Sequence, residues 1–313
     1  MTFLQRALEL AERGRGTTRP NPVVGAVVVA DGEVVGEGWH ERKGGPHAEV
    51  VALEAAGDRA RGSTLYVTME PCGHHGSTPP CTEAVLRSGV ARVVAGSLDP
   101  NPEAGGGLEL LRAQGVGVED AGSFEARQQN EAWRAWVAGG RPFVTLKLAV
   151  TLDGRVTVPG SRWVTGEESR RRVHELRAAS DAVAVGMGTV RADDPELTAR
   201  DVGAATQPRR LAFGRGPLEE GSPLELVPGP LEDELARLGG EGVQSLLLEG
   251  GPTLATAFLE ADLVDKLLLF VAPTIAGEGQ PLLGSLSRPI ALTRLQAGQV
   301  GADVLLSAYI HEP

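Results

Sequence analysis

The sequence predicts a mixed α/β protein with two domains. Its 313 residues suffice for two domains of ordinary size. A β-hairpin near the start is followed by strands that alternate with helices, an order typical of a mixed α/β sheet. Gly139-Gly140-Arg141-Pro142 interrupts this pattern, and a second alternation begins after it. We therefore expect one domain over residues 1–140 and another over residues 141–313.

In the first half, apolar spacing and turn residues mark the elements. Thr2 is placed to cap a first helix, and Asp31-Gly32 is placed to turn a hairpin. Gly89 follows an apolar helical pattern and is expected to end that helix. The expected helices cover residues 3–11, 47–55, 81–88, 108–113 and 124–137, and the expected strands cover residues 23–29, 33–39, 64–69, 90–95 and 116–118.

The second half repeats the alternation with buried strands and amphipathic helices. Gly186-Met187-Gly188-Thr189 is expected to lead into a short helix, and residues 216–230 are expected to form a surface loop. The tail is expected to form a β-hairpin within residues 292–310. The other expected strands cover residues 143–150, 182–185, 210–213, 245–248 and 267–272, and the other expected helices cover residues 167–178, 231–238 and 254–259.

Composition limits the partners of this chain. The formal net charge is −11 and the pI about 5.1, which disfavours a broad nucleic-acid surface because phosphate backbones require clustered Lys and Arg. The N-terminal segment is amphipathic and interrupted by charge, unlike a secretory signal, and apolar runs such as 267–273 are the length of a strand. We therefore expect a cytoplasmic protein that binds neither nucleic acid nor a membrane.

One histidine and two cysteines indicate a zinc site. Cys72 and Cys81 are the two cysteines of the chain, and His47 provides a third ligand. Three protein ligands leave the fourth tetrahedral position open for water, which is the pattern of catalytic zinc. Glu49 lies two residues after His47 and is placed to act as general acid and base on that water. This arrangement matches the zinc nucleobase deaminases, except that eight residues separate the cysteines where the general signature has two.

Two other interpretations of these residues remain open. The cysteines are able to form a disulfide, although nothing else in the sequence indicates secretion. Alternatively, His74 or His75 completes a closed structural zinc site. Neither alternative explains the presence of Glu49 in the His-Ala-Glu sequence, and we therefore favour a catalytic site.

The second half contains weaker signals. Residues 249–253, Glu-Gly-Gly-Pro-Thr, follow an apolar strand and open a helix, which suits either phosphate binding or an ordinary helix cap. They do not form the Gly-x-Gly-x-x-Gly fingerprint of dinucleotide-binding domains. Asp193-Asp194-Pro195 is compatible with a simple turn, and Arg170-Arg171-Arg172 with a solvated helix face.

Seven motifs are distributed along both halves of the chain. They are Thr18-Arg19-Pro20-Asn21-Pro22-Val23-Val24-Gly25, His47-Ala48-Glu49, residues 70–81, Lys147-Leu148-Ala149, Leu152-Asp153-Gly154-Arg155, Ala192-Asp193-Asp194-Pro195 and Glu249-Gly250-Gly251-Pro252-Thr253-Leu254. Together they closely resemble one known family, the bifunctional deaminase–reductases of riboflavin biosynthesis. The order of the motifs and the two-domain length agree across nearly the whole chain, and the eight-residue gap between the cysteines is typical of this family.

For residues 1–140 the resemblance implies a three-layer, cytidine-deaminase-like domain. Its implied reaction is the zinc-dependent hydrolytic removal of an amino group from 2,5-diamino-6-(5-phosphoribosylamino)pyrimidin-4-one. His47, Cys72 and Cys81 match the zinc ligands of the family, and Glu49 matches its proton carrier. The positions matched to substrate binding are Asn21, His40 and His74.

For residues 141–313 the resemblance implies a dihydrofolate-reductase-like domain that uses NADPH to reduce the ribosyl group to a ribityl chain. Lys147 is expected to support the reacting end. The positions matched to NADP are Ala149, Trp163, Thr189, Asp193, Gly251, Pro252, Thr253, Leu254, Ala255, Thr256 and Ala257. The positions matched to substrate are Ser161, Arg177, Leu197, Arg200 and Glu249. Gly214-Arg215 departs from the Asp-Ser of the family, which leaves the role of Arg215 open.

Two rival functions are weaker. A nucleoside or tRNA deaminase with an unrelated appended domain conflicts with the acidity of the chain and with the long cysteine spacing. A binding module with purely structural zinc has no use for Glu49. We therefore expect a bifunctional enzyme whose partners are small phosphorylated pyrimidines and, in a homo-oligomer, further copies of the chain.

Overall fold

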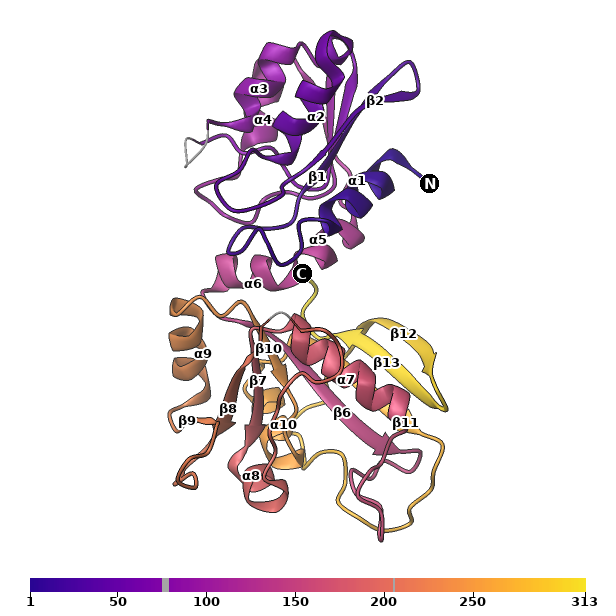
Figure 1. The fold of residues 1–313 in the computed structure, drawn as a ribbon, viewed down its shortest axis with the longest axis vertical. Helices are drawn as coiled ribbons and strands as arrows, with labels where there is room; N and C mark the ends of the chain where they lie inside the picture. The colour runs from indigo at the N-terminus through magenta and orange to yellow at the C-terminus, as the bar shows by residue number, and fades with distance from the viewer. Residues whose placement is uncertain (75–78, 205) are drawn as a thin grey trace. The chain divides into compact units, whose positions relative to one another are not determined.

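The computed structural model describes residues 1–74, 79–204 and 206–313 (Figure 1). His75, which we considered as an alternative zinc ligand, and residues 76–78 of the expected zinc motif lie outside the described residues. The chain divides into two compact units, a first unit of Met1–Gly139 with Pro313 and a second unit of Gly140–Glu312. Among the described residues, no helix has both the length and the apolar character that crossing a bilayer requires.

The first unit is built on a five-stranded sheet with the order β2-β1-β3-β4-β5. β1 pairs antiparallel with β2 and β3, whereas β3, β4 and β5 run parallel. The strands are β1 (Gly25–Ala30), β2 (Glu33–Trp39), β3 (Thr64–Val67), β4 (Arg92–Ala95) and β5 (Gly117–Asp120). The helices are α1 (Phe3–Glu12), α2 (Ala48–Ala56), the 3₁₀ helix η1 (Gly57–Ala60), α3 (Cys81–Ser88), α4 (Gly107–Ala113), α5 (Phe124–Gln129) and α6 (Glu131–Gly139).

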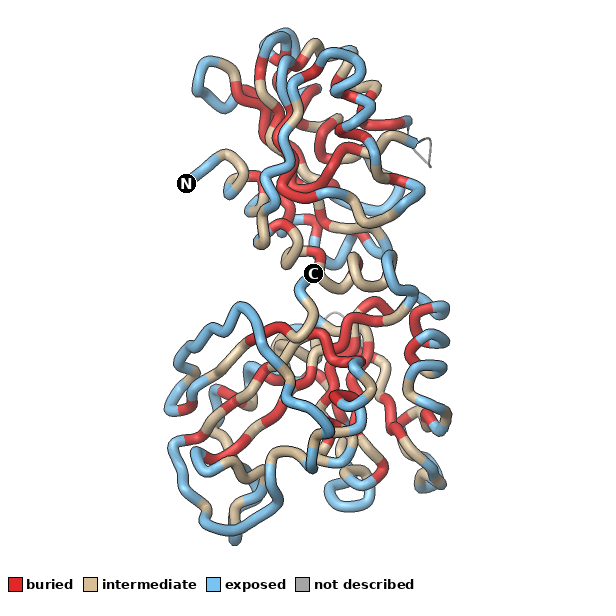
Figure 2. Tube along the Cα trace, turned by 180° about the vertical axis from the view of Figure 1, so that it is seen from behind, coloured by how far each residue is buried: buried red, intermediate tan, exposed pale blue. Residues whose placement is uncertain are grey.

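Helices cover both faces of this sheet, which gives the expected three layers. On one face, Ala7 and Leu10 of α1 pack with Val27 and Val29 of β1. The alternate residues of β1 face a larger core that also contains buried residues of α2, α3 and α4. Figure 2 shows this burial along the strands of the sheet. The initial hairpin and the following strand–helix alternation are thus confirmed.

Helix α2 lies unusually close to the sheet because two glycines of β2 face it. A Cβ atom added to Gly36 would lie 2.2 Å from the carbonyl oxygen of Ala52, and one added to Gly38 would lie 2.6 Å from that of Ala48. Real Cβ atoms do not approach this closely, so these positions require glycine. The contact fixes the height of α2 above the sheet and therefore the position of its N-terminus.

The prediction of one helix over residues 124–137 was wrong, because the chain forms α5 and α6 there. Asn130 lies between them and is 6% exposed. Its side-chain oxygen accepts a hydrogen bond from the amide of Val23 at 2.9 Å, and its side-chain nitrogen donates to the carbonyl of Val23 at 2.9 Å. This contact with a distant segment accompanies the interruption of the helix.

The second unit contains an eight-stranded sheet with the order β12-β13-β11-β6-β10-β7-β8-β9. The strands from β11 to β9 run parallel, and β13 and β12 add an antiparallel edge. The strands are β6 (Phe143–Thr151), β7 (Ala182–Gly186), β8 (Arg209–Phe213), β9 (Glu225–Val227), β10 (Ser245–Leu248), β11 (Lys266–Ala272), β12 (Thr293–Val300) and β13 (Asp303–Tyr309). The helices are α7 (Glu167–Ala179), α8 (Met187–Asp193), α9 (Leu231–Gly240) and α10 (Pro252–Glu260).

Two hydrophobic clusters lie on opposite faces of this sheet. Residues of α9 and α10, including Leu235 and Phe258, pack against one face. Val183 and Val185 of β7 point to the other face, where Leu176 of α7 and Met187 of α8 meet them. The predicted second alternation and the tail hairpin are confirmed.

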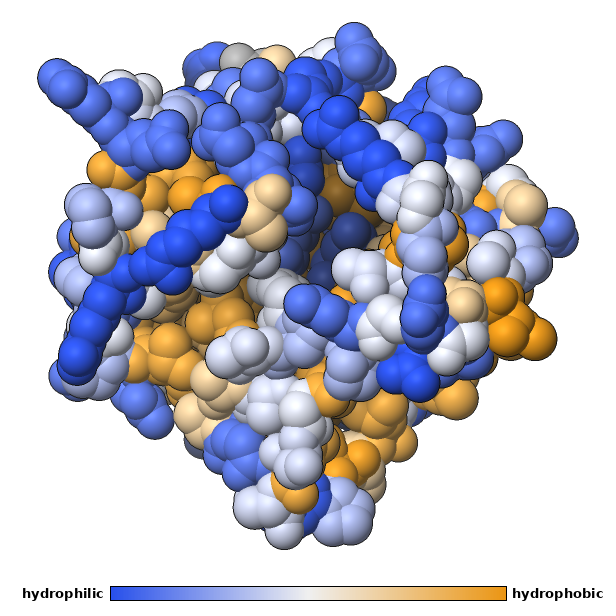
Figure 3. Space-filling view, turned by 90° about the horizontal axis from the view of Figure 1, so that it is seen from below, coloured by the Kyte–Doolittle hydropathy of each residue, from blue (hydrophilic) through white to orange (hydrophobic). Residues whose placement is uncertain are grey.

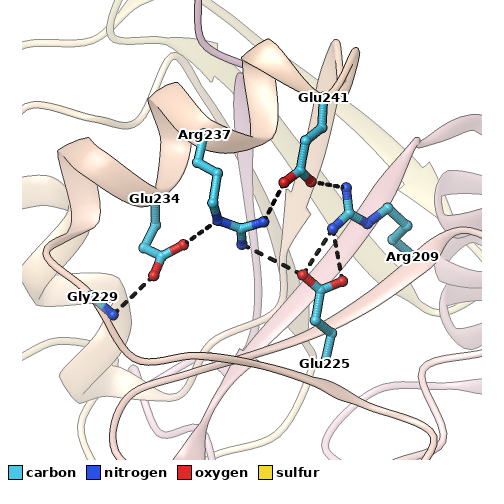
Figure 4. A network of polar contacts seen from close by, with 6 residues as sticks. All are labelled: Arg209, Glu225, Gly229, Glu234, Arg237 and Glu241. Carbon is cyan, nitrogen blue, oxygen red and sulfur yellow. Dashed lines mark hydrogen bonds and ion pairs between the residues drawn. The ribbon is translucent and has the colours of Figure 1, made fainter.

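Strand β9 was missed, because residues 216–230 were expected to form a surface loop. β9 is three residues long and lies at the edge of the sheet. Glu225 of β9 accepts bonds from both Arg209 of β8 and Arg237 of α9, and Glu241 contacts the same two arginines (Figure 4). These ion pairs connect β9 to its neighbours, and no local sequence pattern signals them.

We predict that Gly38→Ala destabilises the first unit. The added Cβ would push α2 away from β2, and overpacking of this kind costs about 1–3 kcal/mol in the free energy of unfolding. Chemical denaturation measures the change. The matched control is Gly240→Ala, where an added Cβ meets nothing within 4 Å. Equal stability of Gly38→Ala and the unmodified protein would contradict the close packing of α2.

Candidate active sites

The structure brings His47, Cys72 and Cys81 together in the first unit. The Nδ1 atom of His47 lies 3.1 Å from the Sγ atom of Cys81 and 3.6 Å from the Sγ atom of Cys72. The three ligand atoms all lie within 4.8 Å of one another. Tetrahedral zinc with ordinary Zn–N and Zn–S bonds places such atoms about 3.5–3.8 Å apart, so this donor set fits the ion.

Two helix N-termini and one loop build this cluster. His47 is the N-cap of α2, Cys81 is the first residue of α3, and Cys72 follows β3 in a loop. The amide of Cys81 also donates to the Sγ atom of Cys72 at 3.3 Å. Hydrogen bonds from Cys81 and His47 lower the pKa of Cys72 to about 4, which favours the thiolate that a metal binds. Both cysteines are free thiols, so the structure contains no disulfide between them.

Glu49 is the buried carboxylate of this site. It lies in the first turn of α2 and is 3% exposed. Burial is the main cause that raises its pKa to about 7; the positive charge of His47 opposes this shift, and the nearby Cys72 adds to it. A carboxyl group with a pKa near neutrality is able both to accept and to return a proton.

Asn21 and His40 lie beside the ligands as a hydrogen-bonded pair. The His40 ring is centred 5.3 Å from the His47 ring. Nδ1 of His40 lies 3.0 Å from the carbonyl oxygen of Pro46, which is only an acceptor, so Nδ1 carries the proton. Burial lowers the pKa of His40, and Nε2 of the neutral ring accepts from Asn21 at 3.3 Å. His74, by contrast, is exposed beside the residues that are not described.

Sequence reasoning gave no role to Glu70 or Gly107, although both shape the loop that carries Cys72. The carboxylate of Glu70 accepts from the amide of Leu108 at 2.9 Å and from that of Asp99 at 3.2 Å. A Cβ on Gly107 would lie 1.7 Å from the carbonyl oxygen of Pro71. The only signal in the sequence is that Glu70 directly precedes Pro71-Cys72.

The second unit contains a cavity of about 1020 Å³ at the carboxyl ends of β6, β7 and β10. Figure 3 looks onto this unit from below and shows a hollowed surface with hydrophilic residues around it. The volume is at the upper end of the range that is typical of small-molecule and cofactor sites. The cavity contains Ala149, Trp163, Thr189, Asp193, Gly251, Pro252, Thr253 and Leu254 of the expected cofactor positions, and Arg177, Leu197, Arg200 and Glu249 of the expected substrate positions. Lys147, which was expected to support the reacting end, also lines it.

The remaining expected residues are not among those that line this cavity. Ser161 exchanges hydrogen bonds with the backbone of Trp163, and Thr256 donates to the carbonyl of Pro252. Ala255 is fully buried in the hydrophobic core. Ala257 continues the same helix, α10, beyond the lining residues. Arg215 is exposed, and its carbonyl oxygen accepts from Arg191.

Glycines make room for a ligand at the start of α10. Gly251 is the N-cap of this helix and Pro252 its first residue. A Cβ on Gly251 would lie 3.3 Å from Oγ1 of Thr189, and one on Gly250 would lie 3.1 Å from Cβ of Leu254. Side chains at both positions would crowd the cavity, so the glycines let a ligand approach the helix start, where backbone amides favour phosphate.

Arg170 belongs to the cavity rather than to a solvated helix face, so that part of the interpretation of Arg170-Arg171-Arg172 was wrong. Its guanidinium lies 5.1 Å from the ring centre of Trp163, and Arg162 lies 5.0 Å from the same ring. Trp163 is 54% exposed, so its ring remains accessible. Arg171 and Arg172 are exposed and pair with Glu175 of α7, as expected for a helix surface.

Glu249 joins two cations inside the cavity. Its side chain is 9% exposed, and its oxygens lie 2.6 and 3.0 Å from Nε and Nη2 of Arg177. Nζ of Lys147 lies 3.6 Å from Oε2 of Glu249. Burial alone raises the pKa of Glu249, but Lys147 and Arg177 outweigh burial and hold it below its ordinary value. Glu249 is therefore an anion that orients both cations.

Family models match both halves of the chain. Residues 1–97 match the zinc-binding region of cytidine and deoxycytidylate deaminases. Residues 142–306 match the RibD C-terminal domain, which is more than half of the chain. The two matches occur in the order that the sequence motifs predict.

Relatives extend this match over the whole length. The riboflavin biosynthesis protein RibD of Aquifex aeolicus is 40% identical over 97% of this chain and 96% of its own, and that of Escherichia coli is 41% identical over 88% of both. The crystal structure of a diaminohydroxyphosphoribosylaminopyrimidine deaminase/5-amino-6-(5-phosphoribosylamino)uracil reductase from Thermotoga maritima is 36% identical, with a TM-score of 0.82 over 98% of this chain and 97% of that chain. Acinetobacter baumannii RibD superposes with a TM-score of 0.84, at 35% identity over 98% of this chain and 97% of its own. This chain therefore belongs to the RibD family of bifunctional deaminase–reductases of riboflavin biosynthesis.

Proposed function

We propose that residues 1–140 carry the deaminase activity of this bifunctional enzyme and residues 141–313 its reductase activity. The division of the chain between Gly139 and Gly140 supports this boundary, as do the separate positions of the two family matches. The observation that best supports the assignment is the buried Glu49 beside three zinc-compatible ligands, because a purely structural metal site needs no such carboxylate.

In the deaminase, His47, Cys72 and Cys81 hold Zn²⁺, which when bound supplies Lewis-acid activation of water near neutral pH. Glu49 takes a proton from the attacking water and delivers it to the departing amino nitrogen, so that ammonia leaves and the pyrimidine gains oxygen. Its pKa of about 7 suits both transfers. Asn21 and neutral His40 orient the pyrimidine, and His74 contacts the ribose phosphate.

In the reductase, NADPH supplies the hydride that reduces the opened ribosyl group. The glycines before α10 admit its phosphates, and Trp163, Thr189 and Asp193 contact the rest of the cofactor. Arg177 and Arg200 bind the phosphate of the substrate because a guanidinium pairs with oxyanions in two directions. Glu249 holds Lys147 beside the reacting carbon, where close positioning lowers the barrier to transfer.

The enzyme acts as a cytoplasmic homo-oligomer that pairs through the β12–β13 hairpin. Every residue of β12 except its last is exposed, and β12 ends the order of the sheet. Leu295 is 66% exposed and Val304 of β13 is 42% exposed. Uncovered apolar edge strands favour pairing with another chain. The two free thiols suit a reducing compartment.

Glu49→Gln is expected to lower the deaminase kcat by about 10²–10⁴-fold, because the amide cannot carry the proton. Zinc content, measured by elemental analysis, should remain one ion per chain. Reductase activity on the deaminated substrate serves as the internal control and should not change. A zinc-loaded Glu49→Gln protein with full deaminase activity would remove Glu49 from the mechanism.

Arg200→Ala is expected to raise the reductase KM for the phosphorylated substrate by about 10–100-fold, because it removes charge-assisted hydrogen bonds of about 1.5–3 kcal/mol. The KM for NADPH should stay nearly constant. Steady-state kinetics with each substrate varied in turn separates the two effects. If the variant instead raises the KM for NADPH and leaves the KM for the phosphorylated substrate unchanged, we have assigned the two phosphate sites the wrong way round.

Leu295→Lys is expected to convert the oligomer into monomers, since a charge on the paired edge opposes association. Light scattering on a size-exclusion column gives the mass directly. Ile275→Lys is the matched control, because Ile275 is an equally exposed apolar residue of the same unit, at 74%, outside the hairpin. A monomeric unmodified protein would refute oligomerisation, and an unchanged mass for Leu295→Lys would exclude pairing through this hairpin.

A further inference from the structure

The segment that carries Arg200 has a constrained backbone. Leu197 is 2% exposed and has a φ angle of +53°, a left-handed conformation that a branched side chain rarely adopts. Such conformations persist where surrounding contacts fix the backbone. The side chain of Arg200 is itself 52% exposed and pairs with Glu196, four residues earlier in the chain. The direction of Arg200 therefore depends on what holds the backbone of residues 197–200.

The side chains of Gln207, His174 and Arg177, all outside the segment, contact this backbone. The amide of Gln207 accepts from the N–H of Ala199 at 2.8 Å and donates to its carbonyl at 2.9 Å. On either side of Ala199, the backbone contacts His174 of α7. Its Nδ1 atom lies 3.0 Å from the carbonyl oxygen of Thr198 and 3.2 Å from the amide nitrogen of Arg200.

His174 uses one ring nitrogen for both contacts. When Nδ1 carries a proton it donates to Thr198, and when it does not it accepts from Arg200, so either neutral form holds the segment. The charged groups that act on the ring are Arg177 of α7, Arg200 of the segment and Glu249 after β10. Burial, then Arg177 and more weakly Arg200 lower the pKa of His174, whereas the hydrogen bond to Thr198 and the charge of Glu249 oppose this shift. The net shift is downward, so the neutral ring predominates near neutral pH.

The same helix also carries the second phosphate-binding arginine. Arg177 follows His174 by three residues, so the two side chains share one face of α7. Nη1 of Arg177 donates to the carbonyl of Thr198 at 3.2 Å, the oxygen that His174 also contacts. Helix α7 thus presents one arginine directly and fixes the backbone that presents the other.

We infer that His174 is a positioning residue of the reductase, whose Nδ1 atom fixes the backbone of Thr198 and Arg200 and so directs Arg200 toward the phosphate of the substrate. This inference rests on the proposed function, which places that phosphate at Arg177 and Arg200. His174 need not touch the substrate for this role.

The test compares three substitutions at residue 174. His174→Leu removes the contact and should raise the reductase KM for the phosphorylated substrate about tenfold, with kcat and the KM for NADPH within about twofold of the unmodified enzyme. His174→Asn should recover most of the loss, because the amide of Asn reaches the place of Nδ1. His174→Gln should not, because its amide lies one atom further out. For the same substrate without its phosphate, all three variants should match the unmodified enzyme.

His311→Asn is the control, since His311 is the other histidine of the second unit. If His174→Leu leaves the KM unchanged while Arg200→Ala raises it, the inference is wrong and the proposed function stands. If neither substitution raises the KM for the phosphorylated substrate, the assignment of the substrate phosphate to Arg177 and Arg200 is wrong. If kcat falls and both KM values rise by similar factors, and His174→Asn does not restore them, His174 has only a general structural role and the inference is overturned. If His174→Leu does not fold, the difference between Asn and Gln decides between these outcomes.

Discussion

Each unit of this enzyme has a glutamate with a largely buried side chain in its candidate active site, and the charges around that carboxylate determine its protonation. Glu49 has His47 as its main positive neighbour, and burial raises its pKa to about 7. Glu249 lies between Lys147 and Arg177, which hold its pKa below the ordinary value despite similar burial. The same side chain is therefore suited to carry protons in one unit and to remain a fixed anion in the other. Hydrolytic deamination requires the first property, and the orientation of cations around a reacting sugar requires the second.

Both carboxylates depend on the same feature of α/β architecture. In parallel sheets the buried strands are apolar, and polar side chains collect where the strands end and helices begin. Cys72 follows β3 and Glu249 follows β10, while His47, Cys81 and Gly251 lie at helix starts. Close packing fixes the positions of these residues. Gly36 and Gly38 set the distance of α2 from the sheet, and Gly107 leaves room for the carbonyl of Pro71, the residue before Cys72. The small residues of the scaffold thus matter to the site although they never enter it.

Sequence reasoning succeeded where the information is local. The cluster of His47, Cys72 and Cys81, the position of Glu49 in a first helical turn and the cap of α1 by Thr2 all follow from short patterns, and each is present in the structure. It failed where a distant contact decides the local structure. Asn130 contacts Val23, which is 107 residues away, and the 124–137 helix is divided there. β9 is held by arginines of β8 and α9. Arg170 lies over the ring of Trp163, a contact that helical periodicity does not predict.

The two arginines that we propose to bind the phosphate of the substrate are oriented in different ways. Arg177 is 14% exposed and is fixed through its own guanidinium, which contacts both Glu249 and Thr198. Arg200 has a mostly exposed side chain, and its partner Glu196 lies in the same segment. A long exposed side chain loses considerable entropy when it binds. Fixing the backbone beforehand means that binding does not also have to order the backbone of the segment. Under the proposed function, contacts to the backbone of residues 198–200 therefore affect recognition of a phosphate that they do not touch.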